Sequence, residues 1–129
     1  MISFDEFQPQ PGVPIYLQIL RFIQRGAAAG RILDGDELPS RRVLSATLGV
    51  NPNTVQKAYR LLEDKGLIRS HTGAKSCMVL NAETVHAVRQ ELLESDVRAL
   101  VRAMRQTGAE KEDALALIAQ LWDLEGMEE

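Results

Sequence analysis

The chain is organised around one stretch of sequence: Gly49-Val50-Asn51-Pro52-Asn53-Thr54-Val55-Gln56-Lys57-Ala58-Tyr59. It has the pattern of a tight turn followed by the start of a helix. Asn51 suits the N-cap, because its side-chain oxygen can accept from the unpaired amides of the first helical turn. Pro52 suits the first helical position, where no amide hydrogen is needed. Polar side chains at the helix start and an apolar flank suit insertion into the DNA major groove. An ordinary capped helix with a solvated end is the alternative, and the flanking segments have to discriminate between the two.

The segment before this stretch predicts a second helix very close to the first. Ser40 can cap a short helix over Arg41 to Leu48, with Val43, Leu44 and Leu48 facing inward. Gly49 ends that helix, and the next one starts after a short turn and continues to Lys65. Two helices joined by so short a turn that contains glycine fit the helix-turn-helix pattern.

The surrounding segments extend this unit to a winged helix. Residues 14–29 have the apolar spacing of a helix. Residues 67–70 and 77–80 are short strand-like runs around a polar tip at 71–76, which predicts a β-hairpin, the wing. Residues 1–12 contain three helix-opposing residues, two prolines and a glycine, and predict an extended arm. We therefore expect a mainly α fold with a small β-hairpin, in which an arm over 1–12 precedes a winged helix-turn-helix domain over 13–80.

The tail, residues 81–129, predicts two further helices, from Asn81 or Thr84 to about Gln106 and from Glu110 to about Glu125. Their apolar faces are too wide for a small winged helix to cover. Packing against a second copy of the chain is the simplest resolution, and folding back onto the same chain is the alternative. The expected dimer-interface residues are Val88, Leu92, Val97, Leu100, Met104, Leu117, Ile118, Leu121 and Trp122.

Composition narrows the class of protein. The 129 residues are 45% hydrophobic and 26% charged, as in an ordinary globular protein, and no apolar run reaches the length of a membrane span. Residues 1–80 hold ten Lys and Arg against seven Asp and Glu, whereas residues 81–129 hold five against eleven. This asymmetry indicates two tasks in two regions. A single cysteine, Cys77, excludes an internal disulfide, and by elimination we expect a cytoplasmic protein without a membrane partner.

Four blocks of sequence resemble the GntR family of bacterial transcription regulators. They are residues 14–19, 35–42, 48–59 and 62–68, in the family's order, and the resemblance covers about residues 13–79. The short helical tail is similar to that of the YtrA-like branch, in which this region mainly dimerises. About fifty residues are too few for the ligand-binding or aminotransferase-like domains of larger relatives.

The resemblance implies where DNA contact falls in this chain. The implied positions are the start of the second helix, the start of the recognition helix and the wing: Arg41, Arg42, Asn51, Asn53, Thr54, Gln56, Thr72 and Gly73. Lys57 and Lys75 add cations suited to phosphate. The wing departs from the family's usual Arg-Gly-x-Gly-Thr-Phe pattern, because Lys75 stands at the second glycine and Cys77 at the aromatic residue.

Other chemistry is sparse. His71 beside the wing suits either a pH-dependent phosphate contact or a plain strand residue, and Cys77 suits a small core residue better than a redox sensor. The tail acids do not pair with histidines at metal-ligand spacing, and no nucleophile-base pair points to an enzyme. We expect no cofactor; a small-molecule effector stays an open hypothesis, with no ligand named.

The sequence thus predicts a homodimeric regulator, a repressor, on a roughly palindromic double-stranded DNA operator. The rival hypothesis is a winged-helix module that binds a partner protein. Steeply salt-dependent DNA binding discriminates the two, because only the regulator releases counterions from phosphates.

Overall fold

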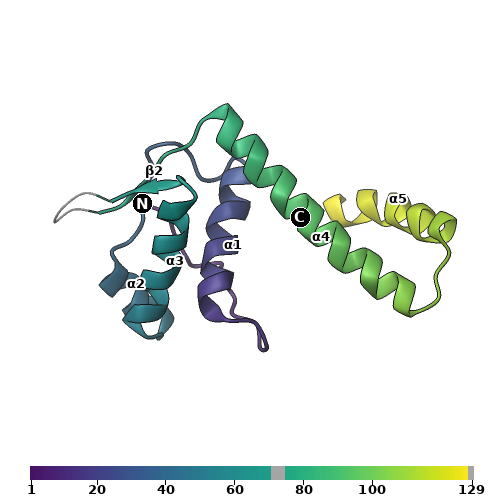
Figure 1. Cartoon of the computed structure of the whole chain (residues 1–129), viewed down its shortest axis with the longest axis horizontal. Helices are drawn as coiled ribbons and strands as arrows, with labels where there is room; N and C mark the ends of the chain where they lie inside the picture. The colour runs from purple at the N-terminus through teal and green to yellow at the C-terminus, as the bar shows by residue number, and fades with distance from the viewer. Residues whose placement is uncertain (71–74, 128–129) are drawn as a thin grey trace. The chain divides into compact units, whose positions relative to one another are not determined.

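The computed structural model describes residues 1–70 and 75–127 (Figure 1). Within them the chain forms five helices and one antiparallel strand pair. In order these are α1 (Ile15–Ala28), α2 (Arg41–Leu48), α3 (Pro52–Asp64), β1 (Ile68–Arg69), β2 (Cys77–Met78), α4 (Ala82–Gln106) and α5 (Lys111–Met127). The chain divides into two compact units, Met1–Leu92 and Leu93–Glu129, so α4 contributes to both. The predicted fold class, mainly α with a small hairpin after a helix-turn-helix, is confirmed.

The helix boundaries follow the capping residues that the sequence marks. The Ser40 hydroxyl accepts from the Val43 amide at 3.1 Å, and the Asn51 side chain accepts from the Asn53 amide at 2.8 Å. Pro52 opens α3. Gly49 takes the left-handed conformation that ends α2, with φ of 67°. Both helices therefore begin where their caps satisfy otherwise unpaired amides.

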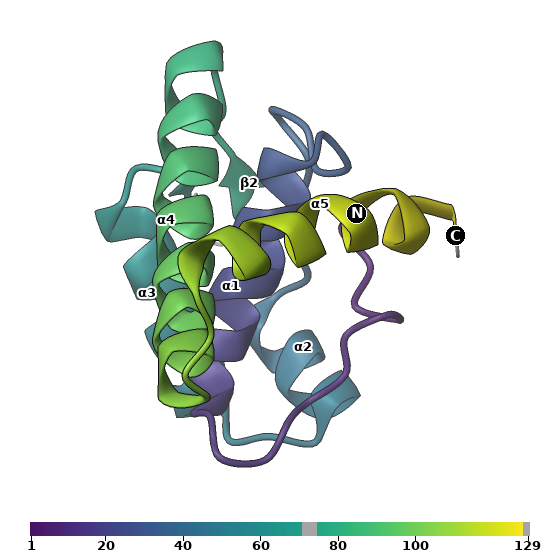
Figure 2. The ribbon, with the colours of Figure 1, turned by 90° about the vertical axis from the view of Figure 1, so that its right-hand side faces the viewer.

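The core of the first unit forms around α3, which packs against α1 and α2 (Figure 1, Figure 2). Val55, Tyr59 and Leu62 of α3 are completely buried, as the sequence predicts. They meet an aliphatic cluster that includes Ile19 and Ile23 of α1. Because α3 is held on its whole apolar side, its polar side is fixed in orientation relative to the rest of the unit.

Val43 is a correction to the predicted inward face of α2. Its side chain is 53% exposed, whereas Leu44 is 1% exposed. A helix turns by about 100° per residue, so Leu44, Ser45 and Leu48 share one side and Val43 falls on another. The inward face of α2 therefore consists of residues spaced three and four positions apart, Leu44, Ser45 and Leu48.

The hairpin is shorter than predicted but is braced on a second edge. Ile68 pairs with Met78 and Arg69 with Cys77. On the far side of β2, the Met78 amide donates to the Asp36 carbonyl at 2.8 Å, and the Leu38 amide donates to the Ser76 carbonyl at 2.9 Å. Backbone hydrogen bonds thus tie the base of the hairpin to the segment that leads into α2.

The N-terminal residues, expected as an arm outside the domain, contribute to its core. They form no helix or strand, but Ile2 and Phe4 are buried. The rings of Phe4 and Phe22 stack with centroids 4.9 Å apart, and Phe7 meets both rings edge-on. The Ile2 amide donates to the Glu37 carbonyl at 2.7 Å. Burial of these aromatic side chains holds the segment against α1.

The start of α4 belongs to the first unit. The amides of Asn81 and Thr84 each donate to the other's side chain at 2.9 Å, so both candidate start residues take part in the cap. Val88 is buried in the core, and the Arg89 guanidinium donates to the Ala28 carbonyl at 2.7 Å. This first stretch of α4 therefore packs within its own chain.

The second unit contains the rest of α4, the turn at Gly108 and α5. None of the described side chains from residue 93 to 126 is buried. Met104, Ala114 and Ile118, close to the turn, are half-buried and the others are exposed. Figure 2 shows α5 diverging from α4 after that turn. The apolar side chains of both helices are left largely in solvent.

Candidate DNA-binding surface

The turn between α2 and α3 is held by local hydrogen bonds. The Val50 amide donates to the Ser45 carbonyl at 3.1 Å, and the Ser45 hydroxyl donates back to the Val50 carbonyl. Two further bonds fix the first turn of α3: the Asn51 side chain caps it, and the Thr54 amide donates to the Asn51 carbonyl at 2.9 Å. These bonds hold the N-terminal end of α3 in one defined conformation.

One side of α3 carries polar and cationic side chains opposite its buried face. At about 100° per residue, Asn53, Gln56, Lys57 and Arg60 lie along one stripe, which we call the recognition stripe. Gln56 is half-buried and the other three are exposed. Thr54 is half-buried and lies beside the stripe. Sequence reasoning missed Arg60, although its spacing of seven residues from Asn53 could have found it.

Lys57 is partly fixed by a neighbouring aromatic ring. Its ammonium nitrogen lies 4.0 Å from the centroid of the Tyr16 ring in α1. A cation over an aromatic face at an exposed site is stabilised by about 0.5–1 kcal/mol. The charge is thereby held in place within the recognition stripe while the side chain stays exposed.

The two arginines at the start of α2 have different environments. Arg42 is exposed, whereas Arg41 is half-buried, with its guanidinium carbon 5.1 Å from the centroid of the Tyr59 ring. The Tyr59 hydroxyl donates to the Pro39 carbonyl at 2.7 Å. Burial raises the pKa of the Tyr59 hydroxyl, against a smaller lowering by the Arg41 charge, so this hydroxyl stays a donor.

The N-terminal ends of α2 and α3 lack acidic side chains. Neither helix has Asp or Glu in its first turn, while α4 begins with Glu83 and α5 with Glu112 and Asp113. Acids at a helix start stabilise the helix dipole, and cations there oppose it. Arg41 and Arg42 occupy that unfavourable position in α2, which leaves this helix end suited to an anion.

The wing is described at its base. Thr72 and Gly73, expected to contact DNA, and His71 lie outside the described residues. Lys75 is exposed, and its ammonium lies 3.8 Å from a carboxylate oxygen of Glu37, which is also exposed. Exposed ion pairs of this kind contribute little to stability, so Lys75 is free to exchange Glu37 for a phosphate. Cys77 is half-buried in β2.

The residues expected at a dimer interface divide into two sets. Val88 is buried in the core of its own chain and Leu92 packs against it, because the first turns of α4 lie on the first unit. We correct the assignment of Val88, whose side chain is buried, and leave it out of the interface; Leu92 is half-buried and stays a prediction. The second set belongs to the second unit and is exposed or half-buried: Val97, Leu100, Met104, Leu117, Ile118, Leu121 and Trp122.

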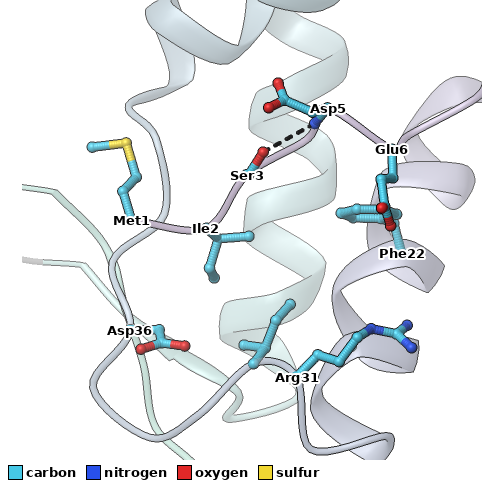
Figure 3. Close-up of a pocket in the computed structure, with 10 residues that line it drawn as sticks. Met1, Ile2, Ser3, Asp5, Glu6, Phe22, Arg31 and Asp36 are labelled. Atoms are coloured by element: carbon cyan, nitrogen blue, oxygen red, sulfur yellow. Dashed lines mark hydrogen bonds between the residues drawn. The ribbon is translucent and has the colours of Figure 1, made fainter.

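A cavity of about 430 Å³ lies in the first unit, between the N-terminal segment and the loop after α1 (Figure 3). Phe22, Ile2 and Ile32 supply apolar lining, and Asp5, Glu6, Arg31 and Asp36 supply charge. None of the expected DNA-contacting residues that the structure describes lines it. The cavity is therefore separate from the recognition stripe.

Metal-ligating clusters and membrane-spanning helices are both absent from the described part of the chain. Among residues 1–70 and 75–127, no three metal-ligating side chains gather in one place. No helix in these ranges combines the length and the apolar character that crossing a membrane requires.

Comparison with known proteins gives consistent matches. The model of the family described as bacterial regulatory proteins, gntR family, matches residues 15–76. The uncharacterized HTH-type transcriptional regulator YhcF of Bacillus subtilis is 33% identical over 84% of this chain and 89% of its own. The HTH-type transcriptional repressor YtrA of the same organism is 39% identical over 65% and 62%. A solved GntR family transcriptional regulator from Listeria monocytogenes superposes with a TM-score of 0.76, at 27% identity over 87% and 98%.

Proposed function

The chain belongs to the GntR family of bacterial regulatory proteins, and we propose that it is a repressor that binds a roughly palindromic operator as a homodimer. Like its relatives it is a DNA-binding transcription regulator and not an enzyme. The repressor assignment is supported by the 39% identity to the repressor YtrA. Since a repressor acts where the chromosome lies, the proposal places the protein in the bacterial cytoplasm.

The recognition stripe on α3 carries this proposal. It joins amide and cationic side chains on a helix whose opposite face is completely buried at Val55 and Leu62. The major groove admits such a helix, and its base edges offer donors and acceptors to side chains of this kind. The end of α3 that enters the groove is the one preceded by the α2–α3 turn.

Each proposed contact follows from side-chain chemistry. Asn53 and Gln56 have the amide geometry that reads adenine, and Thr54 suits a phosphate or a thymine methyl group. Arg42 suits a phosphate or a bidentate pair with guanine, which discriminates by about 1–3 kcal/mol. Lys57, Arg60 and Lys75 suit phosphate oxygens. Asn51 acts through the cap that shapes the helix start.

The exposed apolar residues of the second unit support a homodimer. Leu117, Leu121 and Trp122 are 48%, 43% and 74% exposed. Large apolar patches of this kind mark surfaces that bind another protein. A second copy of the chain offers the same patch, and a two-fold dimer presents two recognition helices to two half-sites. A palindromic operator follows from that symmetry.

A binding experiment with selected DNA tests the proposal. The full chain is used to enrich duplexes from a randomised pool, and fluorescence anisotropy follows binding of the enriched duplex between 50 and 200 mM salt, the range over which about six to ten phosphate contacts lower affinity by roughly 10³–10⁵. We expect enrichment of an inverted repeat and a steep fall in affinity with salt. No duplex binding at 50 mM salt would instead favour a module that binds a partner protein.

Repression is tested separately by transcription in vitro. The enriched duplex is placed over a promoter, and the transcript is measured as the full chain is titrated. We expect the transcript to fall at the concentrations that occupy the duplex. A rise in transcript at the same occupancy would make the protein an activator.

A further inference from the structure

Arg41 lies on the inward side of α2, although it is charged and stands in the first turn. At about 100° per residue, Arg41 shares its side of the helix with Leu44, Ser45 and Leu48. Leu44 and Ser45 are buried, and Leu48 and Arg41 are half-buried. Arg42, the next residue, points to another side and is exposed. The two neighbouring arginines therefore face different surroundings.

The Arg41 guanidinium meets two separate elements of the winged helix. Its carbon lies 5.1 Å from the centroid of the Tyr59 ring of α3, and its Nη2 atom lies 3.5 Å from the Ser70 hydroxyl, just after β1. The Ser70 hydroxyl in turn lies 3.0 Å from that of Ser76, which is buried just before β2. One side chain thus contacts the recognition helix and reaches the base of the hairpin.

Partial burial of the Arg41 side chain leaves one of its polar atoms in an unfavourable environment. Within the described residues, the Nε atom of Arg41 is buried and has no hydrogen-bond partner. Buried polar groups are normally paired, so an unpaired one needs a structural explanation. The Tyr59 ring supplies one as a rigid neighbour, because it is completely buried and its hydroxyl is bonded to the Pro39 carbonyl. The guanidinium is therefore positioned by its contacts with the Tyr59 ring and with the Ser70 hydroxyl together, which the single nitrogen of an ammonium group cannot make in the same geometry.

We propose that Arg41 is a positioning residue that fixes the hairpin relative to α3, and that it does not itself contact DNA. The inference rests on the proposed function for its consequence, because the hairpin and α3 are the two parts that would reach DNA. It changes the role expected for Arg41 from the sequence and leaves Arg42 as the arginine of α2 that faces the operator.

The first test needs no DNA. Amide hydrogen exchange is measured on the full chain and on the Arg41→Met variant, which keeps an apolar side chain of similar length. Arg42→Met is the matched control. We expect the Met78 and Val79 amides to exchange about tenfold faster in Arg41→Met, while the buried amides of α3 keep their rates. Unchanged rates at both hairpin amides would overturn the proposal.

The second test separates positioning from a direct charge contact. Affinity is measured for the duplex enriched by the unaltered chain, with Arg41→Met and Arg41→Lys compared. If Arg41 positions the hairpin, both variants lose about tenfold in affinity, because lysine keeps the charge but cannot contact the Tyr59 ring and the Ser70 hydroxyl at the same time. Affinity restored by Arg41→Lys would assign Arg41 to a phosphate and overturn the proposal.

The two tests also distinguish this inference from the proposed function. If the unaltered chain bound no duplex, the function would fail, while the exchange rates would still decide whether Arg41 positions the hairpin. If Arg41→Met failed to fold, the exchange measurement would be made on Arg41→Lys, for which we expect the same faster exchange at Met78 and Val79. Protection equal to that of the unaltered chain would then overturn the positioning role of Arg41.

Discussion

The two units of the chain differ in how they use their apolar residues. In the first unit, Ile19, Tyr59 and Leu62 are completely buried among neighbours from α1, α2 and α3. In the second unit, no described side chain from residue 93 to 126 is buried, and Trp122 is 74% exposed. The first unit completes a core with its own residues, whereas the second presents apolar surface that only another surface can cover.

Charge follows the same division. Residues 1–92 hold eleven Lys and Arg against nine Asp and Glu, whereas residues 93–129 hold four against nine. The helices at the predicted DNA surface, α2 and α3, start without acids, while α5 of the second unit starts with Glu112 and Asp113. An anionic ligand is repelled by the second pattern and accepted by the first. Burial and charge therefore both support the proposal that the first unit contacts DNA.

The largest expected effect is at the core of the first unit. Leu62→Ala removes a completely buried side chain and should lower the free energy of unfolding by about 2–5 kcal/mol. Leu33→Ala, at a side chain that is 59% exposed, should change it by less than about 0.5 kcal/mol. Urea unfolding followed by circular dichroism measures both. Equal values for the two variants would mean that the first unit has no core of the kind described.

A charge placed on the second unit should separate the proposed dimer. Leu121→Glu puts a carboxylate into the apolar surface, and burying it unpaired is costly. Sedimentation equilibrium should give a mass near that of one 14.3 kDa chain, against twice that mass for the unaltered protein. Gln120→Glu, at an exposed polar neighbour, is the control and should stay dimeric. A dimer that survives Leu121→Glu would place the contact elsewhere.

The helix cap at the DNA surface should have a smaller effect. Asn51→Ala removes the acceptor of the Asn53 amide and should destabilise the first unit by about 1 kcal/mol. Asn51→Ser keeps a capping oxygen and should recover most of that loss. Thermal unfolding of the two variants at equal concentration checks the difference. If serine and alanine were equivalent here, capping would not explain the residue.

The smallest effect on stability is expected at the wing. Lys75→Ala breaks an exposed ion pair with Glu37 and should change the free energy of unfolding by less than about 1 kcal/mol. On the enriched duplex, the salt dependence of binding should fall by about one phosphate contact. Lys111→Ala, an exposed lysine of α5, should leave the salt dependence unchanged. A salt dependence identical in both variants would remove Lys75 from the DNA surface.

Local signals explain why much of the fold was predictable. Ser40, Asn51 and Gly49 mark the ends of α2 and α3, and each acts through hydrogen bonds or backbone angles confined to a few residues. The apolar spacing of Val55, Tyr59 and Leu62 likewise reports a face of a single helix. Such features need no knowledge of the partner element, so the sequence alone identifies them.

Val43 is a local error, because hydrophobicity predicts it inward although the helix turn sets it apart from Leu44 and Leu48. Features that depend on distant partners are missed for a different reason. Ile2 and Phe4 joined the core because Phe22 lies within reach in three dimensions. The aromatic contact of Arg41 likewise joins residues 18 positions apart in the sequence. Long-range packing of this kind leaves no periodic signal.

The role of the first unit as the DNA reader is tested most directly by the affinity of Arg42→Ala for the enriched duplex. Arg31→Ala, at an exposed arginine of the same unit that lines the separate cavity, is the matched control. We predict a loss of about 1–3 kcal/mol in binding for Arg42→Ala, with the dimer intact and Arg31→Ala unchanged. Unaltered affinity in Arg42→Ala, or an equal loss in both variants, would contradict the account.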